Sequence, residues 1–279
     1  METTERPHRA ARHIMAEPAA GGRTAALRIA GLTTGYGRGR RRRVVSAGLS
    51  AALPEGSLTA LLGTNGAGKS TLLRTLAGLL PPLDGEVWWN GLRLDDYTAR
   101  TLPRTVAVVL TGRPAAAGLT VADVVRMGRM PYTGFSGRLS AHDLDVADHA
   151  MELAGAARLR DRDMAGLSDG ERQRAMIAKA LAQQTPAILL DEPTAFLDFP
   201  GKVAMLRLLR DLAVRHGKTI LFSSHDLELT FQTVERLWLL SPRGITEGSP
   251  RELAADGSLE RFFPTDGARF DRRSLRFTV

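Results

Sequence analysis

Short apolar runs recur along the chain, and segments with a helical pattern follow them. The apolar runs occupy residues 58–62, 106–110, 187–190 and 219–222. The helical segments lie near residues 72–77, 170–184, 200–216 and 226–234. Continuous apolar runs of this length are typical of strands that are buried on both faces of a parallel sheet. We therefore predict an α/β core built on a mainly parallel sheet.

Other parts of the chain show different patterns. Residues 85–91 predict a strand closed by the turn Asn90-Gly91, a dipeptide that favours tight hairpins, so we expect an antiparallel β-layer within residues 25–110. From about residue 112 to 165 the pattern is helical, with one helix starting at Thr120 and another capped by Ser140.

The two ends of the chain differ from this middle part. Residues 1–24 mix Arg, Ala, Pro and Gly without periodicity, and we expect them to be disordered. A short helix is expected near 250–255. Residues 256–279 form a C-terminal extension that contains four phenylalanines, and we expect these rings to pack on the body of the protein. The main domain is accordingly predicted to span residues 25–255.

A phosphate-binding loop follows the first apolar run. It fits the pattern G-x-x-x-x-G-K-[ST] and consists of Gly63, Thr64, Asn65, Gly66, Ala67, Gly68, Lys69, Ser70 and Thr71. The glycines let successive backbone N–H groups and a helix N-terminus point at phosphates. Lys69 is predicted to reach the β- and γ-phosphates, and the Ser70 hydroxyl is predicted to bind Mg²⁺. The chain is therefore expected to bind a nucleoside triphosphate.

Two carboxylates follow the apolar run 187–190. Asp191 and Glu192 stand at the C-terminal end of this predicted strand, where open α/β sheets bind their ligands. Asp191 is placed to hold Mg²⁺, directly or through water, and Glu192 to polarise the attacking water. The alternative, an acidic strand-to-turn cap, is less favoured once the phosphate loop is present in the same chain.

Three more segments complete a family pattern. They are Leu167-Ser168-Asp169-Gly170-Glu171, Thr194-Ala195-Phe196-Leu197-Asp198 and Ser223-Ser224-His225-Asp226. By itself the first is ambiguous, because Ser168 followed by Glu171 is also an ordinary helix capping box. In this order, and together with the phosphate loop and the acidic strand end, the segments resemble the ATP-binding cassette (ABC) family over about residues 25–255. The resemblance implies a P-loop NTPase of ABC type, with an antiparallel β-subdomain and a helical subdomain inserted at about 112–165.

The resemblance also implies a dimer. Two chains would pair head to tail and enclose two ATP molecules, each contacting the phosphate loop of one chain and the Leu-Ser-x-Gly segment of the other. Ser168, Gly170 and Glu171 match that second segment, at a helix N-terminus that favours a γ-phosphate. Asp198 matches the loop that crosses the dimer interface.

Two further residues match ligand-contacting positions of the family. His225 matches the histidine that contacts the γ-phosphate, and Tyr36 matches the aromatic residue that stacks on adenine. The alternative for Tyr36 is a loop aromatic that caps the β-layer. The remaining histidines stand in polar or amphipathic settings and are expected to be solvated; they are His8, His13, His142, His149 and His216.

Three positions depart from the family pattern. Thr111 stands where the family has a glutamine that contacts Mg²⁺ and senses the membrane partner, and its shorter side chain is expected to reach the metal through a water. Asp169 replaces a glycine and brings a carboxylate near the partner's γ-phosphate. Arg172 and Arg174 are candidates to offset that charge. Thr64 replaces a proline, which a loop should tolerate.

Composition limits the classes of partner. With no Cys, the chain has no disulfides and fits a reducing compartment. No apolar stretch approaches the ~18 residues of a membrane span. The net charge is +8, which reflects either coding bias toward Arg or contact with anionic lipid or an acidic partner. The densest run, Arg38 and Arg40 to Arg43, is interpreted as a solvated hairpin loop.

The resemblance implies the remaining partners. These are membrane-spanning permease subunits, a second copy of the chain and a periplasmic or lipoprotein substrate-binding protein, with this subunit at the cytoplasmic face of a bacterial membrane. Residues 128–140, a Met- and aromatic-containing stretch, stand where the family docks its permease; the alternative is local packing. This stretch resembles that of the cassettes of bacterial iron-siderophore, haem and cobalamin importers. An exporter subunit and a soluble cassette acting on nucleic acid or ribosomes are the alternatives; the latter usually has two fused cassettes or a coiled-coil insertion, so no nucleic-acid partner is expected.

Overall fold

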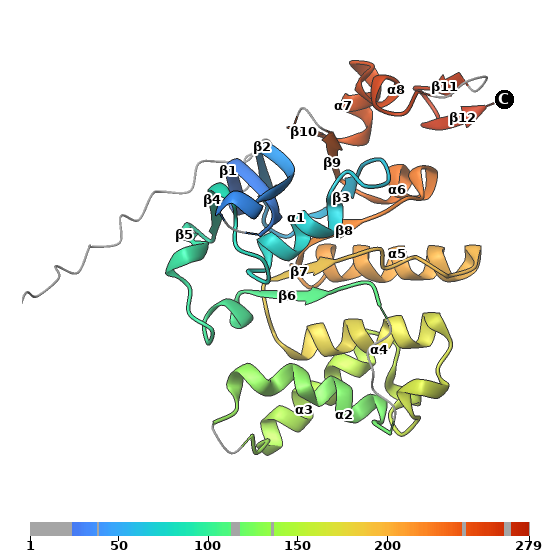
Figure 1. Ribbon diagram of the computed structural model, residues 1–279. Helices are drawn as coiled ribbons and strands as arrows, with labels where there is room; N and C mark the ends of the chain where they lie inside the picture. The colour runs from blue at the N-terminus through green and yellow to red at the C-terminus, as the bar shows by residue number, and fades with distance from the viewer. Residues whose placement is uncertain are drawn as a thin grey trace, which may run out of the picture.

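The computed structural model describes residues 24–37, 39–112, 118–134, 137–241, 244–264 and 269–278. Two sheets carry the fold, and helices pack between them, beside them and at both ends of the molecule (Figure 1). Disorder is expected for residues 1–24; residues 1–23 lie outside the described residues, whereas Thr24 is ordered and its carbonyl oxygen accepts from the backbone N–H of Glu55 at 2.9 Å.

The first sheet is antiparallel, as predicted for this part of the chain. Its strands are arranged in the order β2-β1-β4-β5. Their bounds are Ala25–Tyr36 (β1), Arg43–Pro54 (β2), Asp84–Trp89 (β4) and Leu92–Arg93 (β5). Asn90 and Gly91 both have positive φ, 49° and 77°, which is the backbone of the tight turn predicted between β4 and β5. Between β1 and β2 the short 3₁₀ turn η1 (Gly39–Arg41) begins the expected hairpin loop, where Arg41 and Arg42 are exposed.

The second sheet is the predicted mainly parallel core. Its strands are arranged in the order β10-β9-β3-β8-β7-β6, and only β10 runs antiparallel to its neighbour. Their bounds are Leu58–Leu62 (β3), Val106–Val109 (β6), Ala187–Leu190 (β7), Thr219–Ser223 (β8), Arg236–Ser241 (β9) and Gly244–Gly248 (β10). Every residue of β3, β7 and β8 is buried, which explains why these strands read as continuous apolar runs.

Alternate residues of the central strands contribute to two separate apolar clusters. Leu61, Leu189 and Leu221 pack with helix α1 (Lys69–Leu76) and the antiparallel sheet, while Ala60 and Ile188 pack on the other face. The indole N–H of Trp89 in β4 donates to the carbonyl of Leu76 at 2.9 Å and ties α1 to the antiparallel sheet. This period of two is the expected consequence of a strand covered on both sides.

On the other face of the central sheet, α4 (Asp169–Ala182) packs against β6, and α5 (Phe199–Val214) packs against β3 and β8. Helices α2 (Val121–Arg126) and α3 (Ala141–Leu153) pack on α4, and α6 (Leu227–Thr233) packs on α5. Short 3₁₀ turns lie elsewhere, at η2 (Leu94–Asp96), η3 (Leu102–Arg104), η4 (Met127–Tyr132), η5 (Ala157–Leu159) and η6 (Met164–Gly166). Thr120 and Ser140 cap α2 and α3 with complete capping boxes, so the predicted starts of both helices are confirmed.

The stretch 128–140, interpreted as a permease-docking segment or as local packing, is partly buried among its described residues. Gly128 and Arg129 are buried, because a Cβ at Gly128 would lie 2.3 Å from the carbonyl oxygen of Lys179 and the guanidinium of Arg129 binds Asp143. Met130, in contrast, is 68% exposed. Of the two interpretations given for this stretch, permease docking and local packing, local packing therefore accounts for its first two residues.

The C-terminal part packs at the opposite end of the molecule from α2 and α3 (Figure 1). It contains α7 (Pro250–Ala255), α8 (Ser258–Phe262) and a hairpin of β11 (Arg269–Asp271) and β12 (Arg276–Thr278). Phe270 is 8% exposed and belongs to the main apolar cluster, against which Phe262, Phe263 and Phe277 also pack. The prediction that the aromatic tail packs on the body is thus confirmed.

Candidate functional site

The candidate site lies where parallel strands end at one edge of the central sheet. β3 leads into the loop at Gly63, β7 leads into Asp191, and β8 leads into His225. Because carboxyl ends of parallel strands meet at the same edge, segments that are far apart in the sequence converge there.

The phosphate loop connects β3 to α1 and depends on glycine at two positions. Gly68 is the N-cap of α1 with φ 97°, and a Cβ there would lie 2.6 Å from Cγ1 of Val45. At Gly63 a Cβ would lie 2.9 Å from the carbonyl oxygen of Leu240. Both positions therefore exclude a side chain, and the loop can place its backbone close to a ligand.

The side chain of Lys69 is almost fully buried inside this loop. Its Nζ donates to the carbonyl oxygen of Gly63 at 2.8 Å and to that of Thr64 at 3.4 Å. Burial lowers the pKa of Lys69, and the nearby carboxylates of Glu192 and Asp191 oppose that shift. The ammonium is therefore held beside both carboxylates predicted for the site, while the side chain of Ser70 lies half-buried one residue further along.

Asp191 is buried and receives two hydroxyl hydrogen bonds. Ser223 donates to Oδ1 and Thr111 donates to Oδ2, both at 2.8 Å. The backbone N–H of Asp191 also donates to the carbonyl oxygen of Val109. Thr111 was expected to reach a metal through water. Its hydroxyl instead donates a hydrogen bond to Asp191 and so orients that carboxylate.

Glu192 and His225 form the second pair at this edge. Nε2 of His225 lies 2.6 Å from Oε1 of Glu192, and both side chains are partly exposed. Glu192 has φ 51°, and its backbone N–H donates to the hydroxyl of Ser223. A non-glycine residue at positive φ stores strain that surrounding contacts must hold, and such residues cluster at functional sites. The pair borders a cleft of about 560 Å³.

Ser223 is the residue of this edge to which the sequence analysis assigned no role. It donates to Asp191 and accepts from the backbone of Glu192, so one hydroxyl holds both acidic residues. One feature of the sequence could have indicated this role: Ser223 directly follows the apolar run 219–222 and precedes Ser224 and His225.

Tyr36 is the last residue of β1 rather than a loop residue. Its hydroxyl lies 3.0 Å from the hydroxyl of Thr71 in α1, and 41% of its surface is exposed. The ring therefore stands next to the phosphate loop with one side open, a position from which it can contact a ligand.

Ser168, Gly170 and Glu171 lie at the start of α4. Ser168 and Glu171 form a complete capping box, so the capping role that the sequence left open is present. Asp169 pairs with Arg172 at 2.7 Å, and Arg174 instead donates to the carbonyl of Ala154. Of the two arginines considered as partners for Asp169, Arg172 fills that place.

The start of α4 also adjoins the loop that ends at Asp198. A Cβ at Gly170 would lie 3.4 Å from Cδ2 of Leu197. Asp198 caps α5 by accepting from the backbone N–H of Gly201. Beside it, Phe196 and Phe199 are 86% and 66% exposed, which is unusual for aromatic side chains in a folded chain.

The histidines outside the site fit their predicted settings where they are described. His142, His149 and His216 are exposed. His8 and His13 lie outside the described residues.

Comparisons with known proteins agree with this geometry. A family model described as ABC transporter matches residues 47–195. The ferric enterobactin transport ATP-binding protein of Escherichia coli is 35% identical over 240 residues, which cover 86% of this chain and 87% of that protein.

Two solved structures share the fold. One is an inward-facing ABC transporter described as of metal-chelate type, with 30% identity and a TM-score of 0.72 over 86% of this chain and 89% of that one. The other is a dimeric bacterial ABC transporter cassette, with 26% identity and a TM-score of 0.70 over 80% of this chain and 98% of that one.

Proposed function

Because this chain belongs to the ABC transporter family and is one of its ATP-hydrolysing subunits, we propose that it powers a membrane importer of chelated iron. The observation that carries the ATPase assignment is the convergence of Lys69, Asp191, Glu192 and His225 at one edge of the central sheet. The roles of individual residues and the identity of the cargo are the parts that need experiment.

The phosphate loop suits the triphosphate of ATP. Its two crowded glycines leave a cradle that a Cβ would fill, and the helix N-terminus favours an anion. Lys69 is the cation that contacts the β- and γ-phosphates, and it exchanges its carbonyl partners for phosphate oxygens. Thr64, Asn65, Gly66 and Ala67 complete the wall of the loop, and Tyr36 stacks on the adenine from the end of β1.

The donor set suits Mg²⁺. Ser70 and Asp191 offer the oxygen ligands that this ion prefers, and Asp191 is oriented by Thr111 and Ser223. Among the described residues no group of three His, Cys, Asp or Glu side chains could hold a metal. Most of the ligands therefore have to come from ATP and water. When bound, Mg²⁺ supplies positive charge that screens the phosphate oxygens.

Glu192 is the carboxylate that orients and deprotonates the attacking water. Its backbone is fixed by Ser223, and its side chain is hydrogen-bonded to His225. His225 contacts the γ-phosphate from the end of β8, so the pair couples the water-activating group to the phosphate-contacting group.

A second copy of the chain completes each site. The solved cassette of related fold is dimeric, which supports the head-to-tail arrangement implied by the sequence. In this arrangement Ser168, Gly170 and Glu171 face the γ-phosphate bound by the partner's loop, and Asp198 lies in the interface. The exposed rings of Phe196 and Phe199 beside Asp198 are consistent with burial against that copy.

The permease anchors the subunit at the cytoplasmic face of the membrane. None of the helices in the described ranges is long and apolar enough to cross a bilayer. The exposed Met127 and Met130 beside α2 are available for a permease segment. A substrate-binding protein belongs to the same transport system.

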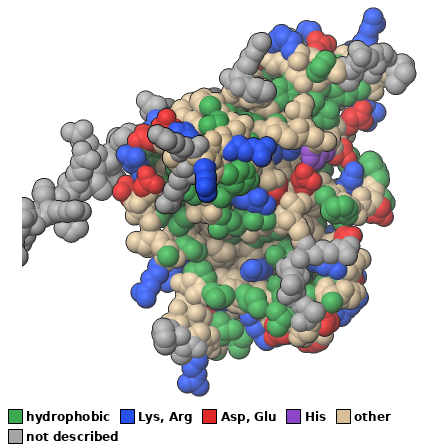
Figure 2. Space-filling view, viewed as in Figure 1, with side chains coloured by type: hydrophobic (Ala, Val, Ile, Leu, Met, Phe, Trp, Pro, Cys, Tyr) green, Lys and Arg blue, Asp and Glu red, His purple; other side chains and the backbone are tan. Residues whose placement is uncertain are grey.

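On the face of the molecule shown in Figure 2, the basic side chains do not form the continuous patch typical of a nucleic-acid surface. Figure 2 shows Lys and Arg side chains in separate places on this face, interrupted by acidic and apolar side chains, rather than gathered in one stripe. A nucleic-acid surface instead needs a continuous basic footprint.

The cargo follows from the permease, since this subunit does not contact it. We infer a chelated iron compound from the relatives named above, with cobalamin as the next candidate. The test is growth of a deletion strain under iron limitation, supplemented in turn with defined siderophores, haem and cobalamin.

Loss of growth on one chelated iron compound, restored by the wild-type gene but not by Glu192→Gln, is the expected result. Normal uptake of all these compounds contradicts the cargo proposal and leaves the ATPase assignment intact. Purification of tagged protein from detergent-solubilised membranes checks the partner, since a polytopic permease should co-purify.

A further inference from the structure

We propose that the C-terminal hairpin, formed by β11 and β12, positions His225 for ATP hydrolysis by holding helix α6 in place. This inference rests on the role proposed above for His225. It assigns to the last residues of the chain a part in the reaction, although they lie outside the region matched by the family model, residues 47–195.

Helix α6 is too short to fix its own position. It has seven residues, and helices below ~12 residues are marginal in water without tertiary packing. His225 stands directly before its N-cap, Asp226. Because 45% of the His225 side chain is exposed, burial does not fix this imidazole. The position of His225 therefore depends on its contact with Glu192 and on where α6 lies.

The N-terminal end of α6 is tied to the core. Asp226 accepts a hydrogen bond from Nζ of Lys202 on α5 at 3.0 Å, and its backbone N–H donates to the hydroxyl of Ser224. Thr230, which is fully buried, donates its hydroxyl to Ser224 as well. These contacts hold the N-terminal end of α6. They do not cover the side of the helix that carries Phe231.

Aromatic rings from the C-terminal part cover that side. Phe231 of α6 is 3% exposed, and its ring lies edge-on to that of Phe270 in β11 at a centroid distance of 6.2 Å. The ring of Phe263 is tilted against that of Phe231 at a centroid distance of 6.5 Å, and the ring of Phe277 in β12 is tilted against that of Phe270 at 5.0 Å. Such pairs contribute beyond the area that they bury.

One hydrogen bond joins the hairpin to the first turn of α6. The backbone N–H of Phe277 donates to Oε1 of Glu228 at 3.2 Å. Glu228 is three residues after His225, so β12 is attached to α6 less than one helical turn from His225.

Hydrogen bonds, an ion pair and apolar burial hold the hairpin against the preceding helix and the core. Its turn is closed by Asp271, whose carboxylate accepts from the backbone of Arg273 and from the hydroxyl of Ser274. Leu275 adopts φ 56° and is buried in the main apolar cluster. Arg272 pairs with Glu260 of α8, which anchors the turn to the preceding helix.

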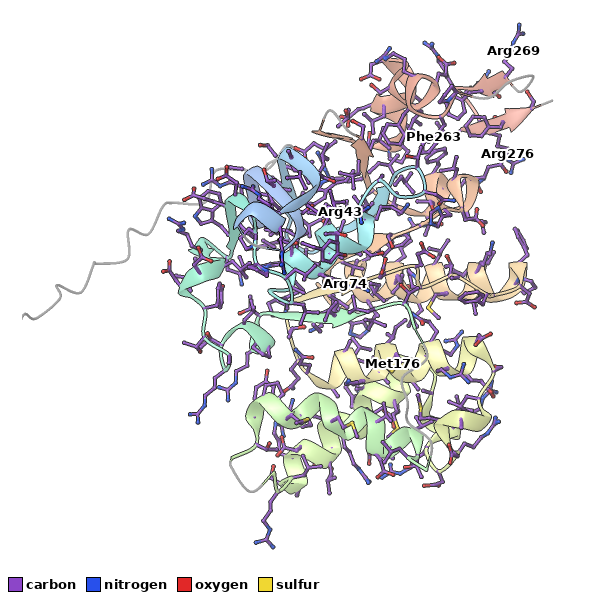
Figure 3. All side chains as sticks on the ribbon, viewed as in Figure 1. Arg43, Arg74, Met176, Phe263, Arg269 and Arg276 are labelled. Atoms are coloured by element: carbon purple, nitrogen blue, oxygen red, sulfur yellow. The ribbon has the colours of Figure 1, made fainter. Side chains whose placement is uncertain are left out.

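The opposite face of the hairpin provides a matched control. Side chains alternate along β11, so Phe270 faces α6 whereas Arg269 is exposed. Figure 3 shows Arg269 and Arg276 at the outer margin of the molecule, with Phe263 closer to its body. Replacing Arg269 therefore shortens a side chain of the same strand without touching α6.

The test compares Phe270→Ala, Phe270→Leu and Arg269→Ala in the full-length chain. Because small displacements of catalytic groups are costly, we expect Phe270→Ala to lower kcat for ATP about tenfold, with KM changed less than about twofold. Phe270→Leu should recover part of the loss, and Arg269→Ala should match wild type. Thermal unfolding and ATP binding report whether each variant is folded.

A second pair of variants tests the hydrogen bond without removing a core ring. Glu228→Ala removes the acceptor for the Phe277 N–H, and Glu228→Gln keeps an acceptor of the same length. We expect a lower kcat in Glu228→Ala and most of the wild-type value in Glu228→Gln. Equal kcat in the two variants contradicts the proposed role of this hydrogen bond in positioning His225.

A double-mutant cycle separates positioning from general loss of structure. If the hairpin acts through His225, adding Phe270→Ala to His225→Ala should lower kcat less than about twofold further. A full additional loss in the double variant overturns the proposal. Wild-type kcat in Phe270→Ala, with His225→Ala impaired, also overturns it. Wild-type kcat in His225→Ala instead refutes the role proposed for His225.

Discussion

Nε2 of His225 lies 2.6 Å from Oε1 of Glu192, which joins the ends of two neighbouring parallel strands. The residues are 33 positions apart in the sequence, and the contact is formed only because β7 and β8 are adjacent in the central sheet. Hydrolysis by this subunit is proposed to depend on this pair, and the predictions below test it and its surroundings.

Replacement of Glu192 by Gln should stop hydrolysis without preventing ATP binding. Gln keeps the shape and a hydrogen-bonding group but cannot accept the proton of water, so we expect kcat to fall at least about 100-fold. Phosphate release and equilibrium nucleotide binding measure the two effects, and the ATP-bound dimer should accumulate. Glu152 on α3 is exposed, and Glu152→Gln is the control for the loss of a carboxylate. Hydrolysis near the wild-type rate in Glu192→Gln would refute the role assigned to Glu192.

Removal of Lys69 should affect binding itself. Lys69→Ala leaves the phosphate charge without its buried cation, so we expect the Kd for ATP to rise at least about tenfold. Isothermal titration with a slowly hydrolysed ATP analogue measures this change. Lys179→Ala removes the same charge from α4 outside the loop, and an equal loss of affinity in that variant would point to a general charge effect.

Mixing two inactive variants should restore part of the activity. If Ser168 of one chain completes the pocket built on Lys69 of the other, Lys69→Ala and Ser168→Arg chains should form heterodimers with one intact composite site. ATPase activity is measured across mixing ratios, with heterodimer formation checked by two different affinity tags. Heterodimers that remain inactive at every ratio would contradict the head-to-tail arrangement.

Thr111 should act on Mg²⁺ through Asp191. Thr111→Val keeps the shape but removes the hydroxyl that donates to Oδ2 of Asp191, whereas Thr111→Ser keeps the hydroxyl. Loss of a group that orients a metal ligand typically weakens metal binding about tenfold or more, so we expect this for Thr111→Val. Mn²⁺ binding in the presence of ATP, followed by electron paramagnetic resonance, measures the effect directly. Equal Mn²⁺ affinity in the Val and Ser variants would show that Thr111 is only a packed residue.

The lowered pKa of Asp143 should make the free energy of unfolding depend on pH in the acid range. The Ser140 hydroxyl, its backbone N–H and the Arg129 guanidinium lower the pKa of Asp143 to about 2. A carboxylate with a lowered pKa stabilises the fold fully above its unfolded value of 3.8, and that contribution is lost as pH falls through the folded value.

Replacement of Asp143 tests this expectation. At pH 7, Asp143→Asn should cost about 1–3 kcal/mol, because the buried guanidinium loses a charged partner. The difference in the free energy of unfolding between wild type and variant should shrink as pH is lowered from about 4 to about 2. Urea unfolding at a series of pH values measures it, with exposed Asp145→Asn as the control. A difference that is constant over this range would contradict the assignment.

Much of the candidate site could be predicted because it is encoded in short segments. The glycine pattern of the phosphate loop, the acidic pair after an apolar run and the capping residues Ser140 and Ser168 act within a few positions of themselves. Continuous apolar runs likewise indicate buried strands wherever they occur. These features depend on local backbone geometry and on hydrophobic period, which are properties of the sequence alone.

The tertiary structure decided which side chains meet and which are buried. Arg129 carries a charge yet is buried, because Asp143, Ala182 and Gln184 supply its hydrogen bonds from other elements. Thr111 meets Asp191, and Ser223 joins both acidic residues, across strands that are distant in the sequence. Sheet order and helix packing create these contacts. The sequence therefore determined the chemistry available to this protein, while the packing of distant segments determined which groups orient one another, because a hydrogen bond requires its two partners within about 3 Å.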